Sequence, residues 1–338
     1  MPSPPPLVSV LLPVRDAECH LRQALDSLDR QSLEHFEVVT VDDGSSDASG
    51  AMLQAWRPRT GITHTHIQQP ACGISAALSA AVHTAQGQLL ARMDADDISA
   101  PTRLEKQSRH LTAHPEIGLV SCQVLVLDNL GGGNDRHVAW LNRLLTSEEI
   151  HGARFIDAPV AHPSVMFRRE LVTQWGGYRE GAFPEDYELW LRWLHHGVRF
   201  EKLPEPLLAW RDGPTRLSRT DPRYSTAAFW RLKTQWLLQE LARRAPIELW
   251  IAPSTSVARK RLRSVISTLP VQGYVDLDPR RIDRLIEGRP IIHPRDLPPP
   301  SPTRLLLTAL GGWGVRESLD DWLRQRHWQP GVHTLHTC

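Results

Sequence analysis

The stretch ARMDADDIS, residues 91–99, brings Asp94, Asp96 and Asp97 within four positions, directly after an apolar pair. Ionised carboxylates about 4 Å apart repel one another by roughly 1 to 4 kcal/mol per pair, depending on the local dielectric. A solvated turn in which Asp97 caps a helix starting near Pro101 would tolerate this cost. At the buried end of a strand, either the pKa values of the carboxyl groups rise or a cation binds among them. The stretch alone leaves both interpretations open.

Strand-like and helix-like segments alternate before this stretch. Short apolar runs rich in β-branched residues predict buried strands, and amphipathic or alanine-rich runs predict helices. The expected strands are 7–14, 36–41, 62–69 and 88–93, and the expected helices are 17–31, 48–56 and 73–87, the last closed by Gly87. Alternation with short loops predicts an α/β fold, a parallel sheet with helices on both faces.

Polar loops follow three of the expected strands. They are Pro13-Val14-Arg15-Asp16, Asp42-Asp43-Gly44-Ser45 and Asp94-Ala95-Asp96-Asp97. Ligands of such sheets bind beyond the carboxyl ends of the strands. Carboxylates from separate loops are therefore expected to meet at one edge of the sheet.

A second acidic pair occurs much later in the chain. Glu185 and Asp186 precede an apolar-faced helix in the stretch FPEDYELWLRWLHHG, residues 183–197. Acids at a helix N-terminus often serve only to cap the helix and to oppose its dipole. This pair alone does not identify a site.

The composition limits the classes of protein. With 338 residues, 41% of them hydrophobic, the chain suffices for one large domain or two ordinary ones. A formal net charge of +1 gives no bulk attraction to nucleic acid, so none is expected as a partner. The four cysteines are isolated, no apolar run reaches about 18 residues, and no signal peptide is recognisable. We expect a cytoplasmic protein, with peripheral contact at the inner face of the membrane left open.

The α/β pattern is interrupted and then restarts. Residues 226–245 predict a linker helix between a first domain at 7–225 and a smaller α/β domain at 246–338. Within the first domain, the glycine-rich stretch 131–133 predicts a hairpin or a flexible loop.

Six stretches together resemble the family 2 glycosyltransferases in order and approximate spacing. They are LLPVRDAECHL, VTVDDGSSD, ARMDADDISAPTRLEKQ, AHPSVMFRR, GGYRE and PEDYELWLRWLHHG, and they span about residues 7–220. The resemblance implies a GT-A fold that transfers a sugar, with inversion, from a nucleotide-diphosphate donor. It implies a UDP-sugar as the favoured donor and a glycan or lipid-linked acceptor in cell-surface polysaccharide synthesis. The C-terminal domain resembles the Rossmann-like domain appended to some bacterial members.

Carried over position by position, the resemblance implies a nucleotide site. Its members, which surround the base and ribose, are Pro13, Val14, Arg15, Asp42 and Asp43. Arg15 stands where many relatives have tyrosine, and an arginine can stack on a nucleobase in its place.

The resemblance also implies roles for both acidic groups. Asp94 would face the ribose or donor sugar and help Asp96 to bind Mg²⁺ or Mn²⁺ on the diphosphate, with Asp97 the third acid of the motif. Asp186 would remove the proton of the acceptor hydroxyl, and Glu185 would orient it.

Two further correspondences concern a turn and two arginines. Gly176 and Gly177 match a turn that lets the backbone approach the substrates, and Arg211 or Arg219 would reach the diphosphate.

Two other functions stay open. A sugar-phosphate nucleotidyltransferase also combines an α/β sheet with acidic metal ligands, but no glycine-rich phosphate loop follows the first expected strand. A catalytically silent nucleotide-sugar-binding scaffold would have no chemical need for both acidic motifs.

Overall fold

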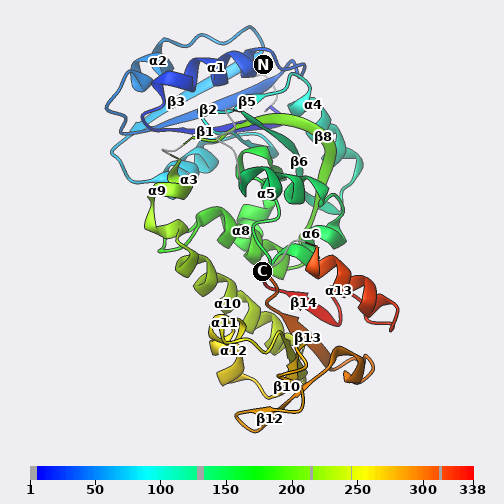
Figure 1. Cartoon of the computed structure of the whole chain (residues 1–338). Helices are drawn as coiled ribbons and strands as arrows, with labels where there is room; N and C mark the ends of the chain where they lie inside the picture. The colour runs from blue at the N-terminus through cyan, green and yellow to red at the C-terminus, as the bar shows by residue number, and fades with distance from the viewer. Residues whose placement is uncertain (1–5, 128–132, 214–215, 245, 312–313) are drawn as a thin grey trace. The chain divides into compact units, whose positions relative to one another are not determined.

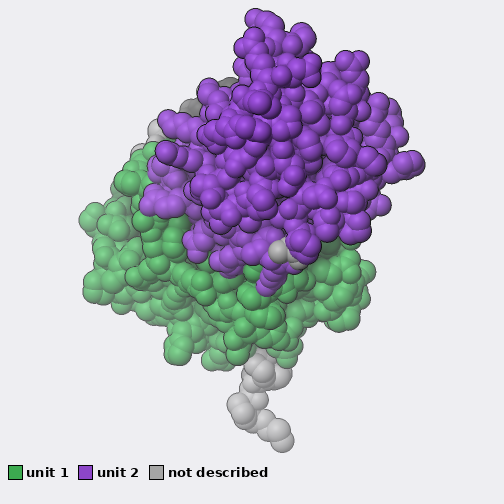
Figure 2. Space-filling model, turned by 90° about the horizontal axis from the view of Figure 1, so that it is seen from below, with its two compact units in different colours: residues 1–150, 159–224 green, residues 151–158, 225–338 purple. Residues whose placement is uncertain are grey.

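The computed structural model describes residues 6–127, 133–213, 216–244, 246–311 and 314–338 (Figure 1). The chain divides into two compact units, one of residues 1–150 and 159–224 and the other of residues 151–158 and 225–338 (Figure 2). The division into domains at 7–225 and 246–338, joined by a linker helix, stays a prediction.

An eight-stranded sheet is the centre of the first unit. Its strands are β1 (Val8–Val14), β2 (Phe36–Asp43), β3 (Ile62–Gln69), β4 (Leu89–Arg92), β5 (Ile98–Ser99), β6 (Ile117–Leu127), β7 (Met166–Arg168) and β8 (Arg199–Arg211). They lie in the order β3-β2-β1-β4-β7-β6-β8-β5.

The first four strands are parallel, as the sequence predicts, but the whole sheet is mixed. β7 runs antiparallel to both β4 and β6, and β5 runs antiparallel to β8. The parallel arrangement is therefore confirmed for the strands on which its prediction was based, and the later strands β5 and β7 make the whole sheet mixed. The pattern of apolar residues reports burial but not the direction in which a later strand enters the sheet.

Helices cover both faces of the parallel part of the sheet. Helix α1 (Glu18–Asp29) and helix α2 (Ser49–Ala55) lie on one side, and α3 (Ile74–Thr84) lies on the other (Figure 1). Every residue of β1 and β2 is buried, as expected for strands covered on both faces.

The helix α3 ends before Gly87, so the prediction that this glycine closes the helix is wrong. Gly87 instead lies against β1, where an added Cβ atom would be 2.6 Å from Ser9 Oγ and 2.7 Å from Ser9 N. The glycine is needed because the backbones approach closely there.

Further helices complete the first unit. They are α4 (Arg103–Ala113), α5 (Gly133–Arg143), α6 (Ser147–Ala153), α7 (Glu170–Trp175), α8 (Glu185–His195) and α9 (Leu217–Thr220), with short 3₁₀ turns η1 (His162–Ser164) and η2 (Pro222–Tyr224). Of the predicted glycine-rich turn, residues 131 and 132 lie outside the described residues, and Gly133 begins α5.

The second unit has its own six-stranded sheet. Its elements are α10 (Thr226–Arg243), β9 (Glu248–Ala252), α11 (Ser256–Arg261), α12 (Arg263–Thr268), β10 (Val271–Val275), β11 (Leu285–Ile286), β12 (Arg289–Ile292), the 3₁₀ turn η3 (Pro294–Asp296), β13 (Arg304–Thr308), α13 (Val315–Arg324) and β14 (Thr334–His336). The strand order is β11-β12-β10-β9-β13-β14, and all neighbouring strands except β11 and β12 are parallel. The five parallel strands have the order of a Rossmann fold, in agreement with the resemblance.

Two buried cations hold the segment 151–158 within the second unit. Lys233 of α10 donates hydrogen bonds to the carbonyl oxygens of Ile156 (2.8 Å) and Thr337 (2.9 Å). Arg154 lies 3.4 Å from the Glu240 carboxylate on the same helix. Among the helices of the described ranges, none combines the length and the apolar character needed to cross a membrane.

Candidate functional site

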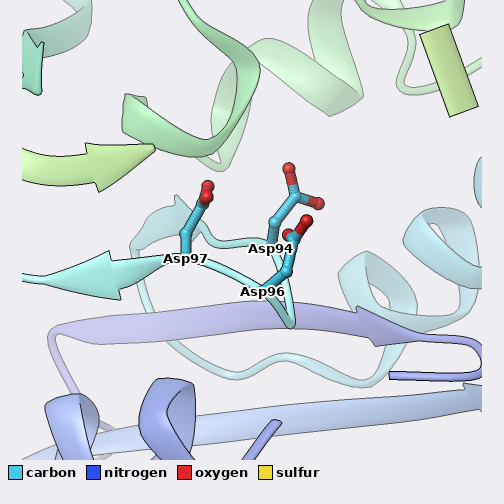
Figure 3. Close-up of side chains that lie close together, drawn as sticks. All are labelled: Asp94, Asp96 and Asp97. Atoms are coloured by element: carbon cyan, nitrogen blue, oxygen red, sulfur yellow. The ribbon is translucent and has the colours of Figure 1, made fainter. Parts of the chain in front are cut away.

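The acidic cluster Asp94, Asp96 and Asp97 lies on the loop between β4 and β5. Its carboxyl groups point to the same side of the loop, with Asp94 and Asp96 adjacent (Figure 3). One oxygen from each residue lies within 4.8 Å of the others. Asp97 does not cap α4, which begins at Arg103; its Oδ1 accepts a hydrogen bond from Arg211 N at 2.8 Å. The capping interpretation is therefore wrong.

The electrostatics of the acidic cluster fit a bound cation. Burial and the charge of Asp94 raise the pKa of Asp96 to about 6. Burial, together with Asp94 and Asp96, raises the pKa of Asp97 well above its usual value. Asp97 Oδ2 is buried and has no hydrogen-bond partner among the described residues. Closely spaced carboxylate oxygens, one of them unpartnered, suit a hard divalent cation such as Mg²⁺ or Mn²⁺.

Arg92, the last residue of β4, is a buried cation next to the acidic cluster. Its side chain is 2% exposed, and its guanidinium forms an ion pair with the Asp94 carboxylate. Its Nε has no hydrogen-bond acceptor among the described residues. Arg103 of α4 fixes the end of the strand by donating to the Arg92 carbonyl at 2.7 Å. Sequence reasoning missed Arg92, although a charged residue at the end of a buried strand was the available signal.

The acid pair Glu185 and Asp186 forms the start of α8. Glu185 is buried, and its Oε2 accepts a hydrogen bond from the Tyr224 hydroxyl at 2.6 Å. Asp186 is partly exposed, and its Oδ1 accepts from Tyr187 N at 2.7 Å. Burial raises the pKa of Glu185. Burial and the charge of Glu185 raise the pKa of Asp186 to about 7, which makes it a competent proton acceptor near neutral pH.

Arg92 connects the acidic cluster with the acid pair electrostatically. Its charge lowers the pKa of Asp96 and Asp97 and also that of Glu185 and Asp186, opposing the effect of burial. The structure therefore brings together two groups of acids that are far apart in the sequence.

His162 and Tyr178 border the same region. His162 Nε2 lies 2.8 Å from the Tyr178 hydroxyl, and His162 Nδ1 lies 3.9 Å from Glu185 Oε1. Burial and the nearby Arg92 charge hold the pKa of His162 well below its usual value, so the ring is neutral at pH 7. Both residues lie in stretches that carry the family resemblance, but no role was predicted for either.

The two acids at the end of β2 have structural partners. Asp42 Oδ1 accepts from Ser45 N at 2.9 Å. Asp43 accepts from Gln69 Nε2 at 2.7 Å and from the backbone of Cys72 and Gly73, both at 2.8 Å. Asp43 thus ties the end of β2 to the end of β3 and to the loop that precedes α3, and its part in nucleotide binding stays a prediction.

The other residues of the predicted nucleotide site lie at the end of β1. Pro13 and Val14 are buried in the strand. The side chain of Arg15 is 54% exposed, and its Nη1 lies 3.8 Å from Asp43 Oδ2. Arg15 is therefore accessible to a ligand at the carboxyl edge of the sheet.

The two predicted arginines have different surroundings. Arg211 lies against the acidic cluster, since its Nε donates to the Asp96 carbonyl at 3.0 Å. Arg219 instead forms hydrogen bonds of 2.7 and 2.8 Å with both carboxylate oxygens of Asp212.

The turn at Gly176 and Gly177 is held from α8. Gly176 has φ +81°, which favours glycine. Arg192 donates to the carbonyl oxygens of Gly176 and Gly177, both at 2.6 Å. It also pairs with the buried Glu188 at 2.8 Å.

Comparisons with known proteins identify the fold and then the family. The crystal structure of S. aureus TarS 1–349 in complex with UDP-GlcNAc matches with a TM-score of 0.56 at 16% identity, over 69% of this chain and 66% of that chain. The first unit accordingly has the GT-A fold. The model of "Glycosyl transferase family 2" matches residues 9–176.

Two similar proteins with named activities support the assignment to this family. Amylovoran biosynthesis glycosyltransferase AmsE of Erwinia amylovora is 32% identical over 217 residues, 63% of this chain and 79% of that protein. UDP-Gal:alpha-D-GlcNAc-diphosphoundecaprenol beta-1,3-galactosyltransferase of Escherichia coli is 26% identical over 61% of this chain and 74% of that protein. The chain belongs to glycosyltransferase family 2.

Proposed function

We propose that this glycosyltransferase moves a sugar from a nucleotide-diphosphate donor to a hydroxyl of a glycan or lipid-linked acceptor, with inversion, in cell-surface polysaccharide synthesis. The observation that carries the proposal is the buried Arg92, whose charge acts on both the acidic cluster and the acid pair. A site for a diphosphate-bound cation and a site for a general base would thus lie close together. The named activities of the two curated relatives support a UDP-sugar donor and a polysaccharide or lipid-linked acceptor.

The cation would be held by Asp96 and Asp94, with Asp97 beside them. When bound, Mg²⁺ or Mn²⁺ supplies positive charge that stabilises the departing diphosphate. The chain contributes the oxygen ligands and the low-dielectric surroundings. Arg92 balances the charge of Asp94 before the donor arrives.

Asp186 would act as the general base. Its carboxylate would accept the proton of the acceptor hydroxyl as that oxygen attacks the anomeric carbon and the diphosphate leaves. The neighbouring negative charge of Glu185 makes Asp186 more basic. A single displacement of this kind has no covalent intermediate and inverts the anomeric carbon.

The nucleotide would bind at the ends of β1 and β2. Arg15 is exposed there and could stack on the base, next to Pro13 and Val14. Asp42 and Asp43 would shape the pocket through the loops they hold.

The test separates donor binding from transfer. Asp96→Ala should lose the Mn²⁺-dependent rise in melting temperature that UDP gives the unaltered protein. Asp186→Asn should keep that rise and lose transfer by about 100-fold or more, measured with UDP-sugars and lipid-linked acceptors. The control is Glu180→Gln, which removes an exposed carboxylate from the loop that precedes α8 and should behave as the unaltered protein.

Two results would contradict the proposal. Full transfer by Asp186→Asn would exclude it as the base. Unchanged metal-dependent binding by Asp96→Ala would remove the metal role from this cluster.

A further inference from the structure

Tyr224 contacts the acid pair, and like the pair it lies beyond residues 9–176, which the family model matches. It ends η2, and its hydroxyl donates to Glu185 Oε2 at 2.6 Å. The turn that carries it is braced, because Asp221 accepts from Arg223 N at 2.8 Å and from Arg223 Nε at 3.0 Å. A donor placed so firmly against a buried carboxylate stabilises the ionised form of that carboxylate.

We propose that Tyr224 is a positioning residue that decides which acid of the pair carries a proton. By donating to Glu185, it keeps Glu185 ionised and directs the proton to Asp186, so that the base is strong. This inference rests on the proposed role of Asp186 as the general base.

The surroundings of the two acids explain why Tyr224 can decide between them. The positive charge of Arg92 lowers the pKa of both acids, so it does not by itself decide which of them is ionised. His162 is neutral and too far from Glu185 Oε1, at 3.9 Å, to donate a hydrogen bond. Among the described residues, Tyr178 also interacts electrostatically with both acids, and Arg223 with Glu185.

Asp186 has a donor of its own, because Tyr187 N donates to Asp186 Oδ1 at 2.7 Å. This backbone contact stays when Tyr224 is altered. Removing the Tyr224 hydroxyl therefore leaves Asp186 with its hydrogen bond and Glu185 without the one from Tyr224. The shared proton should then move to Glu185, and Asp186 should stay ionised at lower pH.

The experiment is the pH dependence of kcat/KM for transfer, measured with the full chain between about pH 5 and 9. We expect the acidic limb of the Tyr224→Phe profile to lie about one pH unit below that of the unaltered protein, since a hydrogen bond to a charged group is at stake. On the plateau, kcat should fall several-fold because the base is weaker. The KM for the donor should change little.

Tyr274→Phe is the matched control. It removes a buried phenolic hydroxyl that has no hydrogen-bond partner among the described residues, on β10 of the second unit. Its profile should coincide with that of the unaltered protein. An acidic limb that stays in place or moves upward in Tyr224→Phe would overturn the proposal.

A double variant tests whether Tyr224 acts through Glu185. Glu185→Gln should lower the acidic limb by itself, and Tyr224→Phe added to it should lower the limb no further. An additional shift in the double variant would show that Tyr224 acts elsewhere and would also overturn the proposal.

A second variant covers the case in which Tyr224→Phe fails to fold. Replacing Tyr224 by a fluorotyrosine with a more acidic hydroxyl should strengthen the donated hydrogen bond and move the acidic limb of the kcat/KM profile to higher pH. A limb that stays in place or moves to lower pH would contradict the inference. Failure of the inference about Tyr224 can be told apart from failure of the proposed function. If Asp186→Asn is inactive while both Tyr224 variants keep the original profile, only the role of Tyr224 is lost.

Discussion

Arg92 is the residue on which the electrostatics of the site depend. It is buried at the end of β4 and is paired with Asp94, while its charge extends to Asp186. A buried arginine needs a compensating negative charge, and a cluster of carboxylates needs a compensating positive one. In the metal-free protein each group therefore stabilises the other.

Replacing Arg92 should expose this dependence. We expect Arg92→Met to lower the free energy of unfolding by about 3–5 kcal/mol, because Asp94 loses its partner. Mn²⁺ should recover more stability in this variant than in the unaltered protein, since it supplies the missing charge. Arg92→Lys keeps the positive charge, so its free energy of unfolding should fall by less than that of Arg92→Met. Denaturant unfolding with and without Mn²⁺ measures both effects, and an equal gain from Mn²⁺ in all three proteins would contradict the argument.

The raised pKa of Asp96 also predicts a pH dependence of stability. The folded protein holds a proton on Asp96 up to about pH 6, whereas the unfolded chain releases it near 3.8. The stabilising contribution is thus complete below about pH 4 and is lost as pH rises through 6. The metal-free Asp96→Asn protein should lack this loss, which reaches at most about 1.4 kcal/mol per pH unit. Unfolding free energies at closely spaced pH values check it; parallel curves for the two proteins would refute the assignment.

The residues of the site divide into those that local sequence identifies and those that it does not. Asp94 and Asp96 follow a recognisable strand, and Asp186 lies in the first turn of a recognisable helix, so the sequence marks them as candidates, although neither stretch identifies a site by itself. Tyr224 binds a carboxylate 39 positions away, on a segment with no periodic pattern of its own. The contact between Tyr224 and Glu185 arises only on folding, and a single sequence gives no sign of it.

At the scale of elements, α8 both carries the acid pair and holds the turn at Gly176 and Gly177. Its first turn presents Glu185 and Asp186, and its third turn holds the glycine turn through Arg192. Arg192 is itself compensated by Glu188, one helical turn earlier. The helix thus fixes its own acid pair relative to the loop that precedes it.

Removal of Arg192 should be costly unless its partner is removed as well. Arg192→Met leaves Glu188 buried without its ion pair and should lower the unfolding free energy by about 3–5 kcal/mol. The loss of unfolding free energy in the double variant Glu188→Leu with Arg192→Met should be smaller than the sum of the losses in the two single variants. A double-mutant cycle from denaturant unfolding measures the coupling, and strict additivity would count against it.

The contact between Gly87 and β1 predicts a steric effect. Gly87→Ala places its Cβ against the backbone atoms Ser9 N and Val8 C, which cannot move freely, and should lower the free energy of unfolding by about 1–3 kcal/mol. Gly152→Ala on α6 is the comparison, because nothing lies within 4 Å of the added atom. A helical glycine replaced by alanine should gain up to about 1 kcal/mol. Similar melting temperatures for the two variants would disprove the steric argument.

Helices and strands could be predicted from the sequence where neighbouring elements in the fold are also neighbours along the chain. Strands β1 to β4 alternate with helices through short loops, and that arrangement allows few topologies. The antiparallel β7 joins the sheet after a long excursion of the chain, so no local pattern encodes its direction.

At the scale of the whole molecule, the two units are not consecutive in the chain. Residues 151–158 belong to the second unit, although the residues on both sides of them belong to the first. Lys233 and Glu240 of α10 supply the polar contacts that hold this segment. A boundary drawn at Tyr224 would therefore separate the segment from its partners.

Truncation tests this arrangement. A protein that ends at Tyr224 should give little soluble material, because Arg154 and its neighbours lose α10. One that ends at Ala245 retains α10 and should recover part of the yield and of the melting temperature. Full solubility and an unchanged melting temperature after truncation at Tyr224 would show that the segment needs no partner from the second unit.

The same arrangement sets an order of events during synthesis. Residues 151–158 leave the ribosome before residues 159–224, and α10 follows only after all of these. At ~5–20 residues per second, the segment waits for several seconds with its buried positions uncovered. During that interval the segment is exposed to chaperones and proteases, so the completion of the second unit is governed by how quickly the later part of the message is translated.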